Sequence, residues 1–284
     1  MGVETGNINI DKIACAVVIY GTRLTECEVY ETFIRRNLQS LDCLLVFDNS
    51  PASLFENVCV PDGVFKYYWN PSNPGVSANY NKAAALAKEI GCRWLLLLDQ
   101  DTSFPVNALE TYRHGVAWRP HSHLFAPLHM IADGRCLSPA NVFRPLRKNV
   151  RPGTYSLKRF DVINSGLLVC VDDFIRVGGY KEDVGLDFSD FQFLERLRRV
   201  VSDVVVLDIE CVQNFSNDSR DKEKLLERYE KFCRGVANFE FHSLRSIIKV
   251  CYLAVKHTVA LAVRCRTFSV FKVLFFAMLE KERK

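Results

Sequence analysis

The sequence predicts an α/β fold, with an open, mostly parallel sheet and helices on both of its faces. Two observations predict this class. Continuous apolar runs rich in β-branched residues, typical of strands covered on both faces, alternate with amphipathic or alanine-rich segments typical of helices. The chain has 284 residues, 49% of them hydrophobic, which is enough to bury a large core. No internal repeat or low-complexity segment interrupts the alternation.

The first half of the chain supplies most of the predicted sheet. Its expected order is strand, helix, strand, strand, helix, strand, helix. The corresponding segments are 12–20, 27–41, 43–50, 64–69, 70–91 (a loop running into a helix), 93–104 and 105–117. Gly91 is expected to end the alanine-rich helix, because glycine is common just after a helix C-terminus.

The second half predicts shorter elements. A hairpin is expected over 123–131 and 134–143, and 159–180 reads as a strand followed by a short helix that Gly178 and Gly179 stop. A helix over 185–200 and a last strand over 203–211 complete the predicted domain. The expected organisation is therefore a domain over residues 1–239 and a helical tail over 240–284.

The tail carries the basic excess of the chain. Residues 240–284 hold nine Lys or Arg and three Asp or Glu, while the whole chain has a net charge of +4. The tail is strongly apolar, but Lys249, Lys256, Arg264, Arg266 and Lys272 interrupt it, so no uninterrupted stretch approaches the ~20 residues needed to span a bilayer. Basic residues among Leu, Val and Phe favour helices lying in an anionic membrane surface. The alternative is a helical pair packed on the domain or on a second subunit, as in a homodimer.

The cysteines and the N-terminal residues predict a cytoplasmic protein. The count of eleven cysteines is odd, no Cys-x-x-Cys occurs, and several lie in apolar strand-like runs, which favours reduced thiols over a disulfide framework. The first residues show neither a basic n-region nor an apolar h-region, so no signal peptide is expected. The expected location is cytoplasmic, and peripheral on the inner face of the plasma membrane if the tail binds lipid.

Polar residues cluster where the predicted strands end. Tyr20, Asp48, Asn73 and Asp99 fall at or just after such ends, and in open α/β sheets ligands bind beyond the carboxyl ends of the strands. Asp99 and Asp101 are two residues apart, so in an extended chain both carboxylates lie on one side and repel unless a cation sits between them. For an isolated Asp-x-Asp, the alternative is a turn that caps the following helix.

Six motifs follow one another along the chain: "VFDNSP", "NPSNPGVSANYNKA", "WLLLLDQDT", "INSGLLV", "GGY" and "DFSDFQFLERLRR". In this order and spacing they resemble the family 2 inverting glycosyltransferases with the GT-A fold, and within them the bacterial rhamnosyltransferase-like branch. The resemblance covers roughly residues 12–215. It implies a Rossmann-like GT-A sheet with a nucleotide-binding half over about 12–118 and an acceptor half over about 119–239.

The resemblance also implies partners. These are a nucleotide-diphospho-sugar donor, with dTDP-rhamnose as the expected one, a Mg²⁺ or Mn²⁺ ion, and a hydroxyl acceptor on a glycan or lipid-linked sugar. The implied process is cell-surface polysaccharide synthesis, and no nucleic-acid partner is expected.

The same resemblance implies roles for individual residues. The implied donor-binding residues are Asp48, Asn73, Gly75, Asn81 and Asp99; the metal ligands are Asp99 and Asp101; the acceptor side holds Asn164, Ser165 and Gly166; and the catalytic base is Asp190. From their positions we add Tyr20, at a strand end, to the donor side and Asp187, beside Asp190, to the acceptor side. Gly21 and Asn214 depart from the family pattern. Asn214 stands near the place where many relatives have a histidine, so a third protein ligand to the metal is not expected.

The chemistry of sugar transfer accounts for these residue types. A departing diphosphate carries dense negative charge, and hard cations with oxygen ligands bridge carboxylates to phosphate and act as Lewis acids. An inverting transfer also needs a carboxylate that takes the proton of the acceptor hydroxyl. Asp187 and Asp190 stand three residues apart at a helix start, where either can instead cap the helix. Asp190 is the favoured base, because it opens the regular apolar pattern of the helix.

Two other function classes fit part of the sequence. An apolar strand followed by Asp-x-Asp also begins the aspartyl-phosphate phosphatases, in which "VDD" at 171–173 would supply a later metal motif. A non-catalytic nucleotide-sugar-binding protein is the second alternative.

Overall fold

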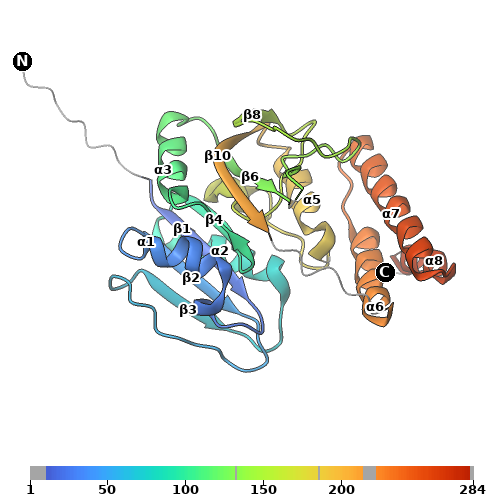
Figure 1. Ribbon diagram of the computed structural model, residues 1–284, viewed down its shortest axis with the longest axis horizontal. Helices are drawn as coiled ribbons and strands as arrows, with labels where there is room; N and C mark the ends of the chain where they lie inside the picture. The colour runs from blue at the N-terminus through green and yellow to red at the C-terminus, as the bar shows by residue number, and fades with distance from the viewer. Residues whose placement is uncertain (1–10, 132, 185, 214–221, 282–284) are drawn as a thin grey trace, which may run out of the picture.

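The computed structural model of the protein describes residues 11–131, 133–184, 186–213 and 222–281. Its centre is a curved sheet, which Figure 1 shows between layers of helices. The strands are β1 (Ile13–Ile19), β2 (Cys43–Asp48), β3 (Phe65–Trp69), β4 (Trp94–Asp99), β5 (Thr102–Ser103), β6 (Leu124–Met130), β7 (Cys136–Ser138), β8 (Gly153–Ser156), β9 (Leu168–Cys170) and β10 (Asp203–Gln213).

The order of the strands confirms the predicted mostly parallel sheet. Neighbouring strands follow the order β3-β2-β1-β4-β9-β6-β10-β5, with β7 on β6 and β8 on β10. The pairs β3–β2, β2–β1, β1–β4 and β6–β10 are parallel. β9 runs antiparallel between β4 and β6, so β4 and β6 point the same way. The carboxyl ends of β1, β2, β3, β4, β6 and β10 therefore lie along one edge of the sheet.

The central strands are apolar because both of their faces are covered. All seven residues of β1 and all six of β2 are buried. One face packs against α2 (Gly75–Ile90), α4 (Val171–Arg176) and α5 (Leu186–Leu197), and the other against α3 (Ala108–Trp118) and the helical turns before β2. This is the layered arrangement that continuous apolar strands predict.

The segment predicted as a helix over 27–41 is shorter and irregular. A 3₁₀ turn (Leu24–Glu26) precedes a π-helical turn, Tyr30–Ile34, and then the short α1 (Arg35–Asn37). Phe33 and Ile34, adjacent in sequence, are both fully buried in the π turn. By contrast, α2 ends where the sequence predicts, since Gly91 takes the left-handed conformation with φ 78°.

Three helices follow the sheet and form a third hydrophobic cluster. They are α6 (Lys222–Asn238), which the sequence reading missed, α7 (Leu244–Cys265) and α8 (Ser269–Lys281), and they lie together at one end of the molecule (Figure 1). Tyr229, Phe232 and Phe239 pack with Phe188 of α5. The described part of the predicted tail, residues 240–281, is therefore held against the body of the protein through α6 and α5.

A buried ionic network joins α7 to the rest of the chain. Lys249, on the buried face of α7, lies with its Nζ 2.8 Å from Oδ1 of Asp161. Asp161 also accepts a hydrogen bond from Arg198, which pairs with Glu195 at 3.2 Å. Ser243, the N-cap of α7, donates to Oε1 of Glu195 at 2.9 Å. The buried charges of Lys249 and Asp161 thus neutralise one another.

Among the described residues, α7 is the one helix long and apolar enough to cross a membrane. This observation is weak by itself, because the core helix of a soluble protein has the same length and composition. Part of α7 is in fact buried against the protein, and Lys249 and Lys256 interrupt its apolar stretch.

Candidate active site

A cavity of about 1180 Å³ opens at the carboxyl ends of β1 and β4. Its walls come from the end of β1, the start of α2, the end of β4 and the residues after it, the segments 135–146 and 161–164, and the start of α5 with the loop before it. Residues of α6 and α7, including Lys231 and Lys256, close it on the side of the C-terminal helices. Seven of the predicted site residues line this cavity: Tyr20, Asn73, Gly75, Asp99, Asp101, Asn164 and Asp190.

Asp99 is the last residue of β4, and Tyr80 of α2 holds its carboxylate. The Tyr80 hydroxyl donates a hydrogen bond of 2.9 Å to Oδ1 of Asp99. Burial raises the pKa of the Asp99 carboxyl to about 6; the hydrogen bond from Tyr80 opposes the rise and the charge of Asp101 adds to it. The chain turns between the two acids, so β4 does not extend to Asp101, yet both carboxylates line the same cavity.

Gln100, between the two acids, joins them to the neighbouring strand. Its Oε1 accepts a hydrogen bond of 2.8 Å from the backbone N–H of Tyr20, and its carbonyl accepts one of 3.3 Å from Val29. The middle residue of the Asp-x-Asp therefore fixes the end of β1 beside the end of β4. The sequence reading did not single it out.

Asp190 reaches the same cavity from the first turns of α5. Its Oδ2 accepts a hydrogen bond of 3.3 Å from the backbone N–H of Asn164, and its Oδ1 accepts one of 3.1 Å from Ser189. Burial, and after it the negative charge of Asp99, raise the pKa of the Asp190 carboxyl to about 7 against the hydrogen bonds that lower it. The charge of a carboxylate from a distant part of the chain thus disfavours the ionised form of Asp190 across the cavity.

This electrostatic conflict fits a divalent cation. Asp99 and Asp101 offer only carboxylate oxygens, which are the ligands that Mg²⁺ and Mn²⁺ prefer. A cation beside them favours the ionised carboxylates and offsets the charge of Asp101 that helps to raise the pKa of Asp99. The donor set therefore fits the predicted metal. Asn214, the other position considered for the metal, lies outside the described residues.

Two of the other predicted acceptor-side residues, Ser165 and Gly166, pack behind the cavity, and Asn164 lines it. Ser165 is fully buried, and its hydroxyl donates to Oγ1 of Thr102 at 2.7 Å. Gly166 has φ 72°, and a Cβ at this position would lie 2.7 Å from Pro127. Asn164 reaches the cavity and accepts a hydrogen bond from Tyr180. The side chain of Asp187 lies outside the described residues.

Two predicted donor-binding residues do not line the cavity. Asp48 is fully buried at the end of β2 and accepts hydrogen bonds from the N–H groups of Ser50 and Leu54, both 2.8 Å, and from Tyr67. Burial raises the pKa of the Asp48 carboxyl, but these hydrogen bonds outweigh it and lower the pKa below its usual value. Its neighbour Asn49 lines the cavity instead.

Asn81 joins α2 to the loop before α5. Its side chain donates to the carbonyl of Tyr180 at 2.9 Å and accepts from the N–H of Tyr180 at 2.8 Å. Gly179 approaches so closely that a Cβ there would lie 2.3 Å from Oδ1 of Asn81. Asn81 therefore fixes the position of the loop that leads to Asp190.

Further polar residues of the cavity were not predicted. Beside Asn49 and Gln100 they are Ser77, Arg135, Asn141, Arg144, Asp161, Glu182, Arg228, Lys231 and Lys256. Most lie in loops and in helices that come together only through the tertiary fold. The basic run at residues 144–151, "RPLRKNVR", is the one visible sequence signal among them.

The motif required by the phosphatase alternative lies at the other end of β4. Cys170, which precedes "VDD", pairs with Trp94 at the start of β4, whereas Asp99 ends that strand. Asp172 is exposed there and pairs with Lys88 at 2.5 Å. Asp173 bonds His123 and Arg176, and its carboxylate lies within 4.8 Å of the His123 and Cys170 ligand atoms. Because Arg176 already neutralises Asp173, this group of three does not resemble a vacant cation site.

No family model and no curated protein matches the sequence. Solved structures do match the fold. GalNAc-T7 bound to UDP, GalNAc and Mn²⁺ is similar with a TM-score of 0.53 and 12% identity, over 81% of this chain and 48% of that one. The S. aureus TarS fragment 1–349 in complex with UDP-GlcNAc is similar with a TM-score of 0.55 and 13% identity, over 95% of this chain and 80% of that one.

These similarities confirm the predicted GT-A type of fold. At this level of identity they show the fold alone. The chain spans about half of the GalNAc-T7 chain, and the activity of that whole protein is not carried over by the match.

Proposed function

We propose that the protein is a metal-dependent inverting glycosyltransferase that uses a nucleotide-diphospho-sugar donor. The observation that carries the proposal is the convergence of Asp99, Asp101 and Asp190 in one cavity at the carboxyl edge of a GT-A-type sheet. The bound nucleotides in the similar structures, UDP and UDP-GlcNAc, support this class of donor. The proposed acceptor is a hydroxyl group of a glycan or lipid-linked sugar in cell-surface polysaccharide synthesis.

Asp99 and Asp101 are the proposed ligands of a Mg²⁺ or Mn²⁺ ion. When bound, this ion would offset the negative charge of the departing diphosphate. The Mn²⁺ in the GalNAc-T7 structure supports a divalent ion of this kind. Tyr80 holds the Asp99 carboxylate through its hydroxyl, so the position of this ligand is fixed before the donor arrives.

Asp190 is the proposed base. In a single displacement, the acceptor oxygen forms a bond to the anomeric carbon as the bond from that carbon to the diphosphate oxygen breaks, and the hydroxyl proton moves to Asp190. The two hydrogen bonds from Asn164 and Ser189 orient the carboxylate and favour its ionised form. A raised pKa brings the carboxyl closer to neutrality and makes it a stronger proton acceptor than an ordinary aspartate.

The proposed donor is dTDP-rhamnose, on the basis of the sequence resemblance. UDP-GlcNAc is the competing donor, since one of the similar structures holds it. Among the described residues, Asn49 and the start of α2 are the proposed contacts of the nucleobase. The Asp48 carboxylate already accepts hydrogen bonds from the N–H groups of Ser50 and Leu54.

The test is a panel of nucleotide sugars with Mg²⁺ or Mn²⁺, scored by thermal shift and by release of the nucleoside diphosphate. We expect one donor to stabilise and turn over, and both effects to disappear in EDTA. Asp101→Ala should lose nearly all turnover. Full activity in EDTA would remove the metal role, and binding without turnover on any acceptor would favour a non-catalytic binder. Rapid release of phosphate from a generic phosphate ester would instead favour the phosphatase alternative.

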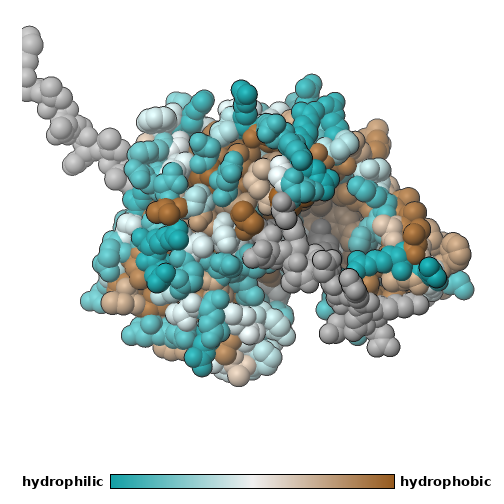
Figure 2. Space-filling view, in the orientation of Figure 1, coloured by the Kyte–Doolittle hydropathy of each residue, from teal (hydrophilic) through white to brown (hydrophobic). Residues whose placement is uncertain are grey.

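We also propose that the outer face of α7 and α8 attaches the protein to an anionic membrane, on the inner face of the plasma membrane. Exposed apolar side chains follow one another at helical spacing along α7, namely Leu244, Ile248, Tyr252, Val255, Val259 and Val263, and α8 adds Phe271, Phe275 and Phe276. Figure 2 shows hydrophobic side chains gathered at this edge of the molecule, with hydrophilic ones among them. Residues 241–279 contain no Asp or Glu, and exposed cations such as Arg264 and Lys272 suit anionic headgroups.

A further inference from the structure

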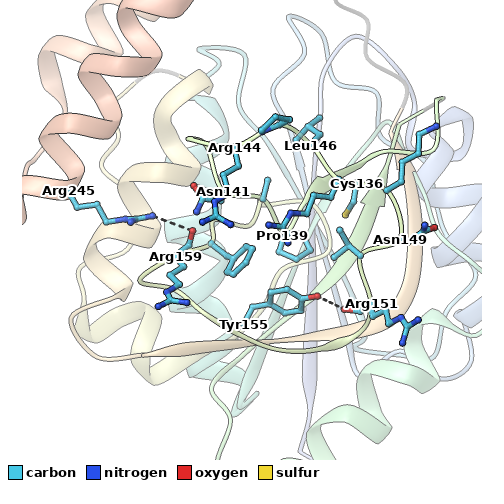
Figure 3. A pocket seen from close by; sticks show the side chains of 16 residues that line it. Cys136, Pro139, Asn141, Arg144, Leu146, Asn149, Arg151, Tyr155, Arg159 and Arg245 are labelled. Carbon is cyan, nitrogen blue, oxygen red and sulfur yellow. Dashed lines mark hydrogen bonds between the residues drawn. The ribbon is translucent and has the colours of Figure 1, made fainter.

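A second cavity, of about 840 Å³, lies beside the candidate active site. It is formed by the loop after β7, by β8 and the turn that follows, and by the start of α7 (Figure 3). Its charged lining is entirely basic. The lining cations are Arg144, Arg147, Lys148, Arg151, Arg159 and Arg245, and among the described residues no Asp or Glu lines the cavity.

These six cations form no close ion pair within the described part of the chain, although Lys148 lies near enough to Asp133 to lower the pKa of that carboxyl. No salt bridge joins any of them to a carboxylate there, whereas nearby Arg135 and Arg198 pair with Asp133 and Asp161. Arg245 reaches from α7 and donates to the carbonyl of Arg159 at 3.3 Å, as Figure 3 shows. Cations gathered in a concave surface create a strong positive potential that attracts an anionic group.

The backbone that carries these cations is fixed. The N–H of Cys136 donates to the carbonyl of Arg147 at 2.8 Å, and the hydroxyl of Tyr155 donates to the carbonyl of Arg151 at 2.6 Å. Arg245 is also held over the ring of Phe143. The guanidinium groups therefore extend from an ordered frame, which favours bidentate recognition of oxyanions.

One loop borders both cavities. Ala140, Asn141, Arg144, Pro145 and Leu146 line both of them. The two cavities therefore adjoin, and a ligand that extends past this loop would place a hydroxyl group near Asp190 and an anionic group among the arginines. A nucleotide donor held at Asp99 and Asp101 would leave this second cavity free for the acceptor.

We propose that this basic cavity binds a phosphate group of the acceptor, so that the sugar is transferred to a phosphate-bearing glycan or lipid-linked molecule. The number of cations favours a diphosphate or successive phosphodiesters over a single carboxylate. The identification of the ligand as an acceptor rests on the function proposed above. The binding of phosphate does not rest on it.

The first experiment measures binding of inorganic pyrophosphate by titration calorimetry in EDTA at low salt. EDTA removes any binding through a metal ion at Asp99 and Asp101, and the double variants below locate the binding that remains. Arg147→Gln/Arg159→Gln should bind at least tenfold more weakly, which corresponds to about 1.4 kcal/mol. The matched control is Arg36→Gln/Arg119→Gln, which removes the same charge at exposed positions far from the cavity and should bind as the unmodified protein does.

The proposal is overturned if the unmodified protein binds no pyrophosphate, or if both double variants lose binding equally. A second experiment assigns the ligand. With the metal ion present, Arg147→Gln/Arg159→Gln should keep its affinity for the nucleotide sugar and lose kcat/KM at least tenfold with phosphate-bearing acceptors. Donor binding absent in every protein refutes the proposed function, while the pyrophosphate result still stands. If the double variant loses only its binding to phosphatidylglycerol vesicles and keeps pyrophosphate binding, the cavity holds a lipid headgroup and the acceptor assignment is wrong.

Discussion

The Nζ of Lys249 lies 2.8 Å from Oδ1 of Asp161, and both side chains are buried. Burial lowers the pKa of the Lys249 ammonium, and the Asp161 carboxylate opposes that effect. Asp161 begins the segment that leads to Asn164, whose N–H holds the carboxylate of Asp190. A cation in the C-terminal helices is therefore connected, through one short segment, to the proposed base.

This ion pair predicts that α7 is part of the cooperative fold. Lys249→Met should lower the free energy of unfolding by about 3 kcal/mol, because it leaves the buried Asp161 with Arg198 as its remaining partner. Lys272→Met, at an exposed position of α8, should change it by less than about 0.5 kcal/mol. Urea unfolding followed by circular dichroism measures both. Equal stability of the two variants would mean that α7 is not held by this pair.

A second prediction concerns the proposed base. Asp190→Asn should lower turnover by about 10²–10⁴-fold, the usual contribution of general-base catalysis, since the amide keeps the shape of the side chain and cannot accept the proton. The binding of donor and metal, measured by thermal shift, should remain nearly intact. Asp187→Asn should cost less. If both variants fold and the order of their effects is reversed, the roles assigned to these two acids are wrong.

The raised pKa of Asp190 predicts a pH dependence of stability in EDTA. Its pKa rises from the ordinary value of 3.8 to about 7 in the folded protein. Between these values the folded state binds more protons than the unfolded state, so this group lowers stability as the pH rises through the window. Asp190→Asn removes the effect. Its stability relative to the unmodified protein should increase from pH 5 to pH 8 in calorimetric unfolding, and a difference that stays constant would contradict the shift.

The apolar outer face of α7 and α8 predicts membrane binding, which point variants can test without deletion of the tail. Deletion of 240–284 would also remove Lys249 and unsettle the domain. Phe271→Ser/Phe276→Ser should reduce flotation with phosphatidylglycerol vesicles at least tenfold, because burying one phenylalanine contributes about 1.5–3 kcal/mol. Val106→Ser/Trp118→Ser removes exposed apolar residues elsewhere and should float normally.

Three outcomes are informative in that experiment. Loss of flotation in the first variant alone supports the membrane proposal. An unmodified protein that ignores anionic vesicles at low salt refutes it. If that protein is instead a dimer in light scattering and the first variant is a monomer, the face contacts a second copy of the chain.

The regular core could be predicted from the sequence because its signals are local. Apolar runs gave β1, β2 and β4 with bounds within a few residues, and the rule that ligands bind beyond the carboxyl ends of strands brought Asp99 and Asp101 to one cavity. α6 was missed although Leu225, Tyr229, Phe232 and Val236 recur at helical spacing. Its many charged residues concealed that pattern.

Other features depend on contacts between distant parts of the chain. The sequence cannot show that turn N–H groups and Tyr67 occupy Asp48, or that Asn81 bonds a loop 99 residues away. The basic cavity is a similar case. The run at 144–151 is visible in the sequence, but Arg245 joins it only because α7 folds back against the body of the protein.

The two faces of α7 set a limit on how far an acceptor has to reach. Leu253 and Lys256 line the active-site cavity, while Val255 and Val259 are exposed on the outer face. A helix with its side chains is about 10–12 Å across. With α7 resting on a bilayer, the cavity opens within roughly one helix diameter of the headgroups. A lipid-linked acceptor one or two sugars long would meet Asp190 without leaving the membrane, whereas the growing end of a long chain would have to fold back. The length of the glycan on the best acceptor therefore indicates the distance between the active site and the lipid headgroups.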